Sequence, residues 1–330
     1  MQICSKCVLD ENFKGIKFDE HGVCNYCRME KPMIQQQEKK SEFELKFQTL
    51  IDEHKGKGVY DAVVAYSGGK DSTYTLHLLK EKYGLNVLAL TFDNWFFSER
   101  AHTNIANVIR STGVDHINLR PSFDTYKKII NVSTKEDIYS PKAMQRASAI
   151  CTSCISLVRF ICFQTAIEKS IPFVIFGMSP GQAPLATSIV KTNARIMEQS
   201  QETTYNALHQ RIGDAINPYF LSKDHFSMPE RFPYSINPLA FNEYNEENII
   251  ELIQQFGWEK PKDADANSTN CLLNAYANDA HIKRYNLNPY AYELATMVRT
   301  GIMDREEGLR RLRERNPESS IISIEKILAK

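Results

Sequence analysis

The sequence lacks several features that would place the protein in a membrane, outside the cell or on nucleic acid. Its 40 basic and 40 acidic side chains leave a formal net charge of zero, whereas proteins that bind nucleic-acid phosphates usually carry a basic excess. We find no apolar run long enough to cross a bilayer. The first residues, "MQICSKCVLD", lack the charged start and apolar core of a secretory signal. We therefore expect a cytoplasmic protein without a membrane span.

Internal repeats and low-complexity segments are also missing from the 330 residues. The glycine-rich loop of this chain has neither the spacing of the Walker A loop nor that of the dinucleotide loop G-x-G-x-x-G. With 42% hydrophobic residues, the chain is expected to form one large globular domain with smaller appended segments.

What the sequence does contain is "YSGGKDST" at residues 66–73, directly after the apolar run Ala62–Ala65. The run is short and half β-branched, which predicts a buried strand. The residues that follow, "STYTLHLLKEKYG", predict a helix that stops at Gly84. Gly68 and Gly69 allow a tight turn with converging N–H groups, and the helix N-terminus adds partial positive charge. This combination predicts a phosphate-binding loop.

Four cysteines near the N-terminus form a second pattern, two C-x2-C pairs separated by sixteen residues: Cys4, Cys7, Cys24 and Cys27. In a cytosolic chain, such spacing indicates metal or redox chemistry rather than disulfides. Four thiolates match a closed structural zinc site, which would supply folding energy to a segment with little core of its own. Iron in a rubredoxin-like site, or four free or redox-active cysteines, are the alternatives. The segment between the pairs suits a small hairpin.

A third group consists of Cys151, Cys154 and Cys271. The pair opens a predicted helix, and Cys271 follows residues that favour a helix start. Three thiolates can hold a [4Fe-4S] cluster and leave one iron open. Spacing alone does not show that the three converge, so the alternative is that they are buried apolar residues. Cys162 fits that alternative best.

The six residues "SGGKDS" resemble the PP-loop of the N-type ATP pyrophosphatases, which cleave ATP between its α and β phosphates. The resemblance implies an α/β fold with a doubly wound parallel sheet of the HUP/PP-loop type. It also implies a four-cysteine zinc ribbon (1–30), a linker helix (31–56), the PP-loop domain (57–240) and a helical C-terminal region (241–330).

The same resemblance assigns the ATP site. The loop would bind the phosphates, and the end of the strand at 86–94 would bind the adenine. Two aspartates that also border ATP, Asp71 and Asp93, would bind magnesium. The strand at 171–184 brings its glycine to the same crevice, but Met178 stands where many relatives have histidine. The implied ATP-binding residues are Ser67, Gly68, Gly69, Lys70, Asp71, Ser72, Thr91, Phe92, Asp93 and Gly177.

Two branches of that superfamily are similar to this chain. The order "SGGKDS", "CTSC" and "NC" (270–271) resembles the cluster-dependent tRNA 2-thiolation enzymes, which implies Cys151, Cys154, Cys271 and Asp71 as catalytic residues. The N-terminal 120 residues, and "MDREEGLRRL" near the C-terminus, resemble the amidotransferases of N-acetyl sugar biosynthesis, which use ammonia. The chain has no recognisable glutaminase triad, so that function would need a glutaminase partner.

The preferred interpretation is an ATP-dependent sulfurtransferase that receives sulfide or the persulfide of a partner protein. The alternatives are the amidotransferase and a non-catalytic nucleotide-sensing or RNA-binding protein. The acceptor is a tRNA or a small molecule, and the neutral charge favours the latter. The C-terminal amphipathic segments predict helices, one of them interrupted near 301–304. Their Glu/Arg-rich end suits a solvated face or a homodimer contact.

Overall fold

The computed structural model describes residues 2–30, 33–261, 267 and 270–329. A six-stranded sheet lies at its centre, in the order β3-β2-β1-β4-β6-β5. Only β5 runs antiparallel to its neighbour. The strands are β1 (Ala62–Ala65), β2 (Val87–Phe92), β3 (Asp115–Leu119), β4 (Phe173–Phe176), β5 (Ile189–Lys191) and β6 (Tyr234–Ile236). The predicted α/β class with a parallel sheet is confirmed.

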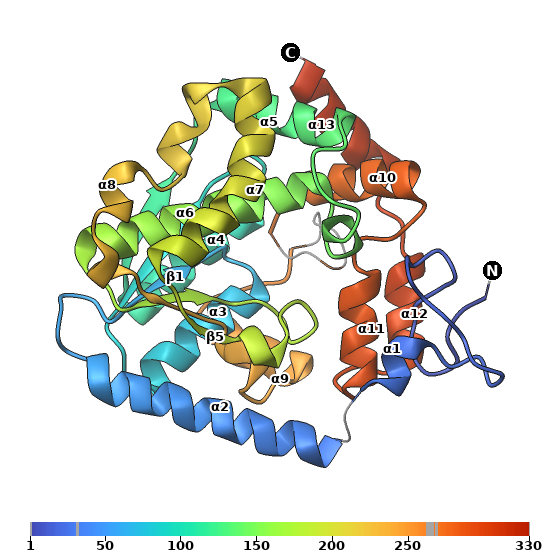
Figure 1. Ribbon diagram of the computed structural model, residues 1–330, viewed down its shortest axis with the longest axis horizontal. Coiled ribbons are helices and arrows are strands. Elements are labelled where there is room, and N and C mark those ends of the chain that lie inside the picture. The colour runs from blue at the N-terminus through green and yellow to red at the C-terminus, as the bar shows by residue number, and fades with distance from the viewer. Residues whose placement is uncertain (1, 31–32, 262–266, 268–269, 330) are drawn as a thin grey trace.

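Helices cover both faces of this sheet (Figure 1). They are α1 (Asn25–Arg28), α2 (Met33–His54), α3 (Lys70–His77), α4 (Glu99–Thr112), α5 (Phe123–Lys135), α6 (Ala149–Lys169), α7 (Ala194–Ile212), α8 (Lys223–Phe226), α9 (Glu246–Gln254), α10 (Leu273–Tyr285), α11 (Ala291–Arg299), α12 (Arg305–Arg313) and α13 (Glu318–Ala329). A π-helical turn at 78–82 extends α3. The interruption predicted near 301–304 separates α11 from α12.

Alternate residues of the strands enter two cores. Val63 and Val174 face α5, α6, α7, α10 and α13, whereas Val64 and Ile175 face α2, α3, α4 and α9. Strands that are buried on both faces have continuous apolar sequences instead of alternating apolar and polar residues. This pattern made β1 and β4 recognisable in the sequence.

Helix α6 corrects one expectation. By length and mean hydropathy it is long and apolar enough to cross a membrane, although we expected no such stretch. Half of its most apolar window is buried inside the protein, where it packs against the sheet and against α5 and α7. The apolar character of α6 is therefore explained by its place in the core.

The N-terminal segment forms a third core with α11 and α12. Val8, Leu9 and Phe13 pack with Leu294 of α11 and Leu309 of α12, and Figure 1 shows the N-terminal segment beside these two helices. In place of the expected hairpin, the segment forms two isolated bridges, Ile3 with Asp10 and Phe18 with Cys24.

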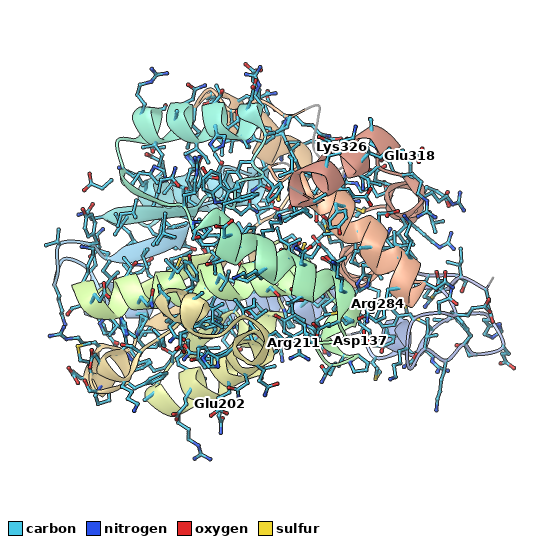
Figure 2. The ribbon with its side chains drawn as sticks, turned by 90° about the horizontal axis from the view of Figure 1, so that it is seen from above. Asp137, Glu202, Arg211, Arg284, Glu318 and Lys326 are labelled. Atoms are coloured by element: carbon cyan, nitrogen blue, oxygen red, sulfur yellow. The ribbon has the colours of Figure 1, made fainter. Side chains whose placement is uncertain are left out.

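The C-terminal helices also pack against the domain that contains the sheet. Leu273 and Ala277 of α10 are buried in the core beside α6. Arg284 of α10 pairs with Asp137, which follows α5, at 2.9 Å; both residues are labelled in Figure 2. The divisions at residues 30, 56 and 240 stay a prediction.

Candidate functional site

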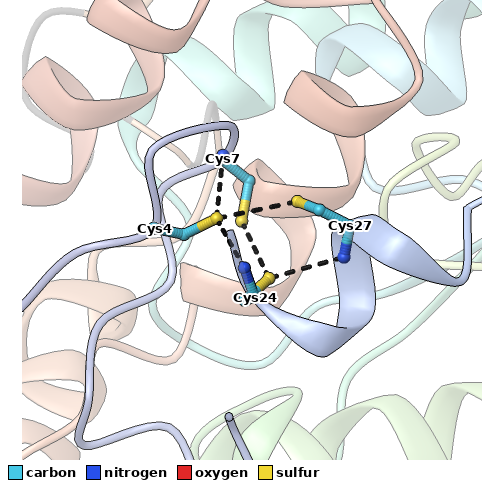
Figure 3. A group of neighbouring side chains, drawn as sticks. All are labelled: Cys4, Cys7, Cys24 and Cys27. Atoms are coloured by element: carbon cyan, nitrogen blue, oxygen red, sulfur yellow. Dashed lines mark hydrogen bonds between the residues drawn. The ribbon is translucent and has the colours of Figure 1, made fainter. Parts of the chain in front are cut away.

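The four N-terminal cysteines converge (Figure 3). Their sulfur atoms all lie within 4.8 Å of one another, with Cys4 Sγ 3.8 Å from Cys27 Sγ and Cys7 Sγ 3.7 Å from Cys24 Sγ. Tetrahedral zinc with Zn–S bonds of about 2.3 Å places its sulfurs about 3.8 Å apart. The spacing is therefore that of four ligands around one ion.

Backbone N–H groups surround these thiols. Those of Lys6, Cys7 and Cys24 donate to Cys4 Sγ at 3.4, 3.5 and 3.2 Å. The hydrogen bond from Cys27 lowers the pKa of Cys7 to about 5, whereas burial raises the pKa of Cys24 to about 11. A bound cation favours the thiolate form of all four thiols together, so the donor set fits a closed metal site.

The predicted phosphate loop runs from β1 to the first turn of α3. Gly68 has φ +70°, and a Cβ there would lie 2.5 Å from Cγ1 of Ile105 in α4, so only glycine fits. The Ser67 hydroxyl accepts the N–H of Gly69 at 3.3 Å, and the Ser67 N–H donates to Ser72 Oγ at 3.3 Å. The loop is thus held in shape by its own serines.

Gly177, predicted to border the same crevice, packs directly against α3. A Cβ at this position would lie 2.7 Å from Thr75 Oγ1 and 2.9 Å from Ser72 Cα. The absence of a side chain therefore lets the end of β4 approach the first turn of the loop's helix. This contact explains the glycine structurally and does not by itself give it a ligand.

The charged residues of the loop are tied to a residue that the sequence analysis missed. Lys70 Nζ donates to Asp71 Oδ1 and to the Tyr244 hydroxyl, both at 2.6 Å. That hydroxyl in turn donates to Asp71 Oδ1 at 2.8 Å. Tyr244 lies between β6 and α9, in a segment without a motif, so no signal in the sequence pointed to it.

These three side chains border a polar cavity of about 60 Å³. Ligand pockets usually measure roughly 300–1,000 Å³, so this cavity is smaller than a typical ligand pocket. Other residues around the cavity include Ser179, Glu246, Lys260, Glu293 and Arg311.

Glu293 of α11 is another residue at this cavity that the sequence analysis missed. It accepts hydrogen bonds from Ser179 Oγ at 2.6 Å and Gln182 Nε2 at 3.0 Å. Burial raises the pKa of its carboxyl group, an effect that these two hydrogen bonds oppose. Its partners belong to "GMSPGQ", so the loop after β4 does border the cavity.

The other predicted magnesium residue lies elsewhere. The Asp93 carboxylate is fully buried and pairs with Arg120, whose Nε donates to Oδ2 at 3.0 Å. Its second oxygen accepts the Trp95 N–H at 3.1 Å. Asp93 is not among the residues described around the cavity that contains Asp71, and a shared magnesium site for the two aspartates stays a prediction.

The strand end predicted to carry adenine has a free backbone edge. Pairing of β2 with β1 stops at Leu90, whereas pairing with β3 continues through Thr91 to Phe92. The Thr91 hydroxyl donates to the Tyr66 carbonyl at 2.7 Å, and the Phe92 ring is buried in the core. Both side chains are thus used within the protein, and Thr91 and Phe92 lie beyond the end of the pairing with β1.

The second cysteine group also converges, in a more open arrangement. Asn94 Nδ2, just after β2, lies 3.3 Å from Cys271 Sγ and 4.0 Å from Cys154 Sγ. Cys151, one turn before Cys154 on α6, donates to Asn274 Oδ1 at 3.4 Å. The three thiols therefore gather where the N-termini of α6 and α10 meet.

This arrangement differs from a single-ion site. Within the described residues, the N-terminal group is the one in which three or more ligand atoms fall inside 4.8 Å. A [4Fe-4S] cluster binds each cysteine through a different iron, which needs a wider spacing. The Tyr126 hydroxyl is buried beside Cys154, toward which it acts as a weak donor, and it has no partner at normal hydrogen-bond geometry among the described residues. An orphaned donor and three half-buried thiols fit a sulfur-rich group.

Burial acts on these thiols as well. It raises the pKa of Cys154 and raises that of Cys271 to about 11, while the hydrogen bond from Asn94 acts in the opposite direction. Cys162, on α6, is fully buried in the protein core, and burial raises its pKa to about 12. It is therefore a core residue, as expected.

One short segment joins the thiol group to the phosphate loop. Asn270 Nδ2 donates to the Ser67 carbonyl at 3.0 Å, and the next residue is Cys271. The segment is fixed to the chain after β2, because the Ser98 N–H donates to the Asn270 carbonyl and the Leu272 N–H to the Phe96 carbonyl. The two candidate centres are thus neighbours.

Comparison with known proteins adds relatives but no assigned activity. No family model matches the chain. It is 24% identical over 311 residues to the uncharacterized protein MJ1599 of Methanocaldococcus jannaschii, covering 94% of this chain and 92% of the relative.

Similar solved structures include the U34-tRNA thiolase NcsA from Methanococcus maripaludis with its [4Fe-4S] cluster, at a TM-score of 0.36 and 16% identity, covering 96% of this chain and 90% of that one. NMN synthetase from Francisella tularensis has a TM-score of 0.39 and 10% identity, covering 88% of this chain and 100% of that one. Similarities of this size leave fold and function to be argued from the residues of this chain.

Proposed function

We propose that the protein is a cytoplasmic ATP-dependent sulfurtransferase. It activates an oxygen of its acceptor with ATP and replaces that oxygen with sulfur at Cys151, Cys154 and Cys271. The observation that carries the proposal is the segment 270–271, in which one residue hydrogen-bonds the phosphate loop and the next contributes a thiol. A loop for activation and thiols for transfer are what a two-step replacement of oxygen requires.

In the first step the acceptor oxygen attacks the α-phosphate, and the bond between that phosphorus and the oxygen leading to the β-phosphate breaks. Pyrophosphate leaves with the electron pair. The N–H groups of the loop and Lys70 face the growing charge. Magnesium bound to pyrophosphate is expected at Asp71, and Glu293 lies across the same cavity.

In the second step sulfide attacks the activated carbon, and AMP leaves as the carbon–oxygen bond breaks. Cys151, Cys154 and Cys271 would hold a [4Fe-4S] cluster, which supplies an open iron position for sulfide. A persulfide donor would instead require two electrons from a reductant. The acceptor, a small molecule or a tRNA, and the donor are the expected partners. Zinc is assigned to Cys4, Cys7, Cys24 and Cys27.

The first half of the proposal is tested by following both products of ATP. The wild type should release pyrophosphate and AMP only when acceptor is present. Asp71→Ala should abolish that release, because it removes the carboxylate that orients Lys70. Tyr244→Phe should lower the rate by roughly tenfold, because a single hydrogen bond contributes about 0.5–1.5 kcal/mol. Release of ADP and phosphate by the wild type would show that the loop has another function.

The second half is tested by anaerobic purification followed by iron, sulfide and zinc counts. Replacing Cys151, Cys154 or Cys271 by Ala should bleach the visible absorbance and stop thiolation, yet leave ATP binding intact. Cys162→Ala is the matched control and should do neither. If the anaerobic protein contains zinc but no iron, and an added ammonia source yields an aminated product, the amidotransferase is the correct function.

A further inference from the structure

Two side chains that no motif contains face the thiol group: Asn94 and Tyr126. We infer that both are hydrogen-bond donors to the anionic sulfur held at Cys151, Cys154 and Cys271, and that they act as positioning residues for sulfur transfer. The inference rests on the proposed function, since it concerns the group that those cysteines bind.

Tyr126 is the stronger of the two. It lies on α5, is 1% exposed, and packs its ring against Phe92 at 5.9 Å. Its hydroxyl is buried with no partner at normal hydrogen-bond geometry among the described residues. It lies beside Cys154 and is close enough to all three thiols to interact with them electrostatically. A phenylalanine would fill the same space without the cost of burying an unpaired hydroxyl.

Asn94 is oriented by its own backbone neighbour. Its Oδ1 accepts the Phe96 N–H at 3.0 Å, and only the oxygen of the amide can accept. This contact fixes the NH₂ group on the opposite side, where it approaches Cys271 at 3.3 Å and Cys154 at 4.0 Å. Asn94 is 3% exposed, so its donor has little access to water.

The two donors have a common effect on sulfur. Hydrogen bonds to thiolates or sulfides stabilise the more negative state and raise the reduction potential of an iron–sulfur group. The closed N-terminal site receives backbone N–H groups on its sulfurs instead. The open centre also receives backbone N–H groups, from Leu273 and Asn274 on Cys271, and the side-chain donors Asn94 and Tyr126 are its additional feature.

Tyr126→Phe tests the inference in two states of the full-length protein. Without iron, the variant should unfold at the same or a higher denaturant concentration than the wild type, because it loses an unpaired hydroxyl. After anaerobic reconstitution, the variant should lose iron several-fold faster than the wild type. Its reduction midpoint should also move to a more negative potential.

Tyr219→Phe is the matched control. Tyr219 also packs against Phe92, but its hydroxyl accepts the Ser122 N–H at 3.2 Å. The control should therefore destabilise the iron-free protein and leave iron retention and midpoint unchanged. Asn94→Asp keeps the acceptor for Phe96 but removes the donor and adds negative charge, so its iron content should fall.

The inference is wrong if iron-free Tyr126→Phe is less stable than Tyr219→Phe, or if its reconstituted form matches the wild type in both iron retention and midpoint. If the reconstituted variant matches the wild type, only the roles of Tyr126 and Asn94 are refuted, and the proposed sulfurtransferase function is unaffected. If the wild type binds no iron under anaerobic reconstitution, the proposed function fails first and the inference fails with it.

Discussion

The two cysteine groups of this protein show how the same ligand type builds two different sites. In the N-terminal group, four sulfurs lie within 4.8 Å and three of the cysteines are fully buried. In the other, three half-buried thiols come from α6 and the start of α10, with Asn94 between two of them. The first suits a closed structural metal, the second a group with an open position.

Their surroundings differ in the same sense. The closed group packs against α11 and α12 and touches no residue of the phosphate loop that the structure describes. In the open group, Cys271 directly follows Asn270, whose side chain donates a hydrogen bond to the Ser67 carbonyl of that loop. The two cysteine groups therefore differ in their distance to the phosphate loop as well as in their number of cysteines.

Cys24→Ser should have the largest effect on this comparison. Residues 2–29 have a small core that surrounds the thiols, so a bound zinc ion would supply much of their folding free energy. Apparent zinc affinities are worth about 10–16 kcal/mol in small fingers. We expect loss of zinc, poor solubility and faster proteolysis of the N-terminal segment. Cys162→Ala should retain all of the zinc. A soluble, fully folded variant without zinc would refute the structural assignment.

Local patterns predicted the fold well where the physics is local. The strand at 62–65, the loop after it and the break near 301–304 all follow from short-range signals of apolar runs, glycine and polar interruptions. The C-x2-C pairs are likewise a local signal, because this short spacing lets both thiols of a pair point toward one metal ion.

The rest depends on contacts between distant segments. Tyr244 reaches Lys70 across 174 positions, and Glu293 reaches Ser179 across 114. Neither lies in a motif, and tertiary packing alone brings them to the cavity. Asp93 shows the converse: a plausible magnesium ligand by position is paired with Arg120.

Selective metal loss would sharpen the comparison further. Air exposure followed by a mild chelator should remove most of the iron from the open centre, while about one zinc per chain remains at the closed site. The physical reason is access, since Cys4, Cys7 and Cys24 are fully buried. Metal content and visible absorbance measured on the same samples check this order. Loss of zinc before iron would contradict it.

Acid should act on the helix of the open centre. His281 of α10 is 3% exposed, and burial lowers its pKa from 6.5 to about 4. The unfolded state therefore binds a proton at higher pH than the folded state, so stability falls as pH drops from about 7 to 4 and changes no further below that. A shift of this size corresponds to about 3 kcal/mol.

Denaturant unfolding of the wild type and of His281→Phe between pH 7 and 4 measures this contribution. The variant cannot titrate at this position, so its stability should depend less on pH by about the same amount. Equal slopes for both proteins would mean that His281 has a normal pKa in the folded chain. Zinc content is monitored in parallel, because acid also protonates the closed site's thiols.

The smallest expected effect tests how firmly the closed site is attached. Arg305 of α12 donates from Nε to the Cys7 carbonyl at 3.1 Å and from Nη2 to the Cys4 carbonyl at 2.9 Å. Arg305→Ala removes charged donors but leaves every thiol in place, so it should cost about 1–2 kcal/mol and speed zinc loss moderately. Arg310→Ala is the control on the same helix. The Arg310 side chain makes exposed ion pairs with Glu307 and Glu314, so its loss should cost about 0.5 kcal/mol or less. Zinc release to a chromogenic chelator compares the two variants. If both release zinc at the wild-type rate, α12 merely covers the closed site and does not hold it together.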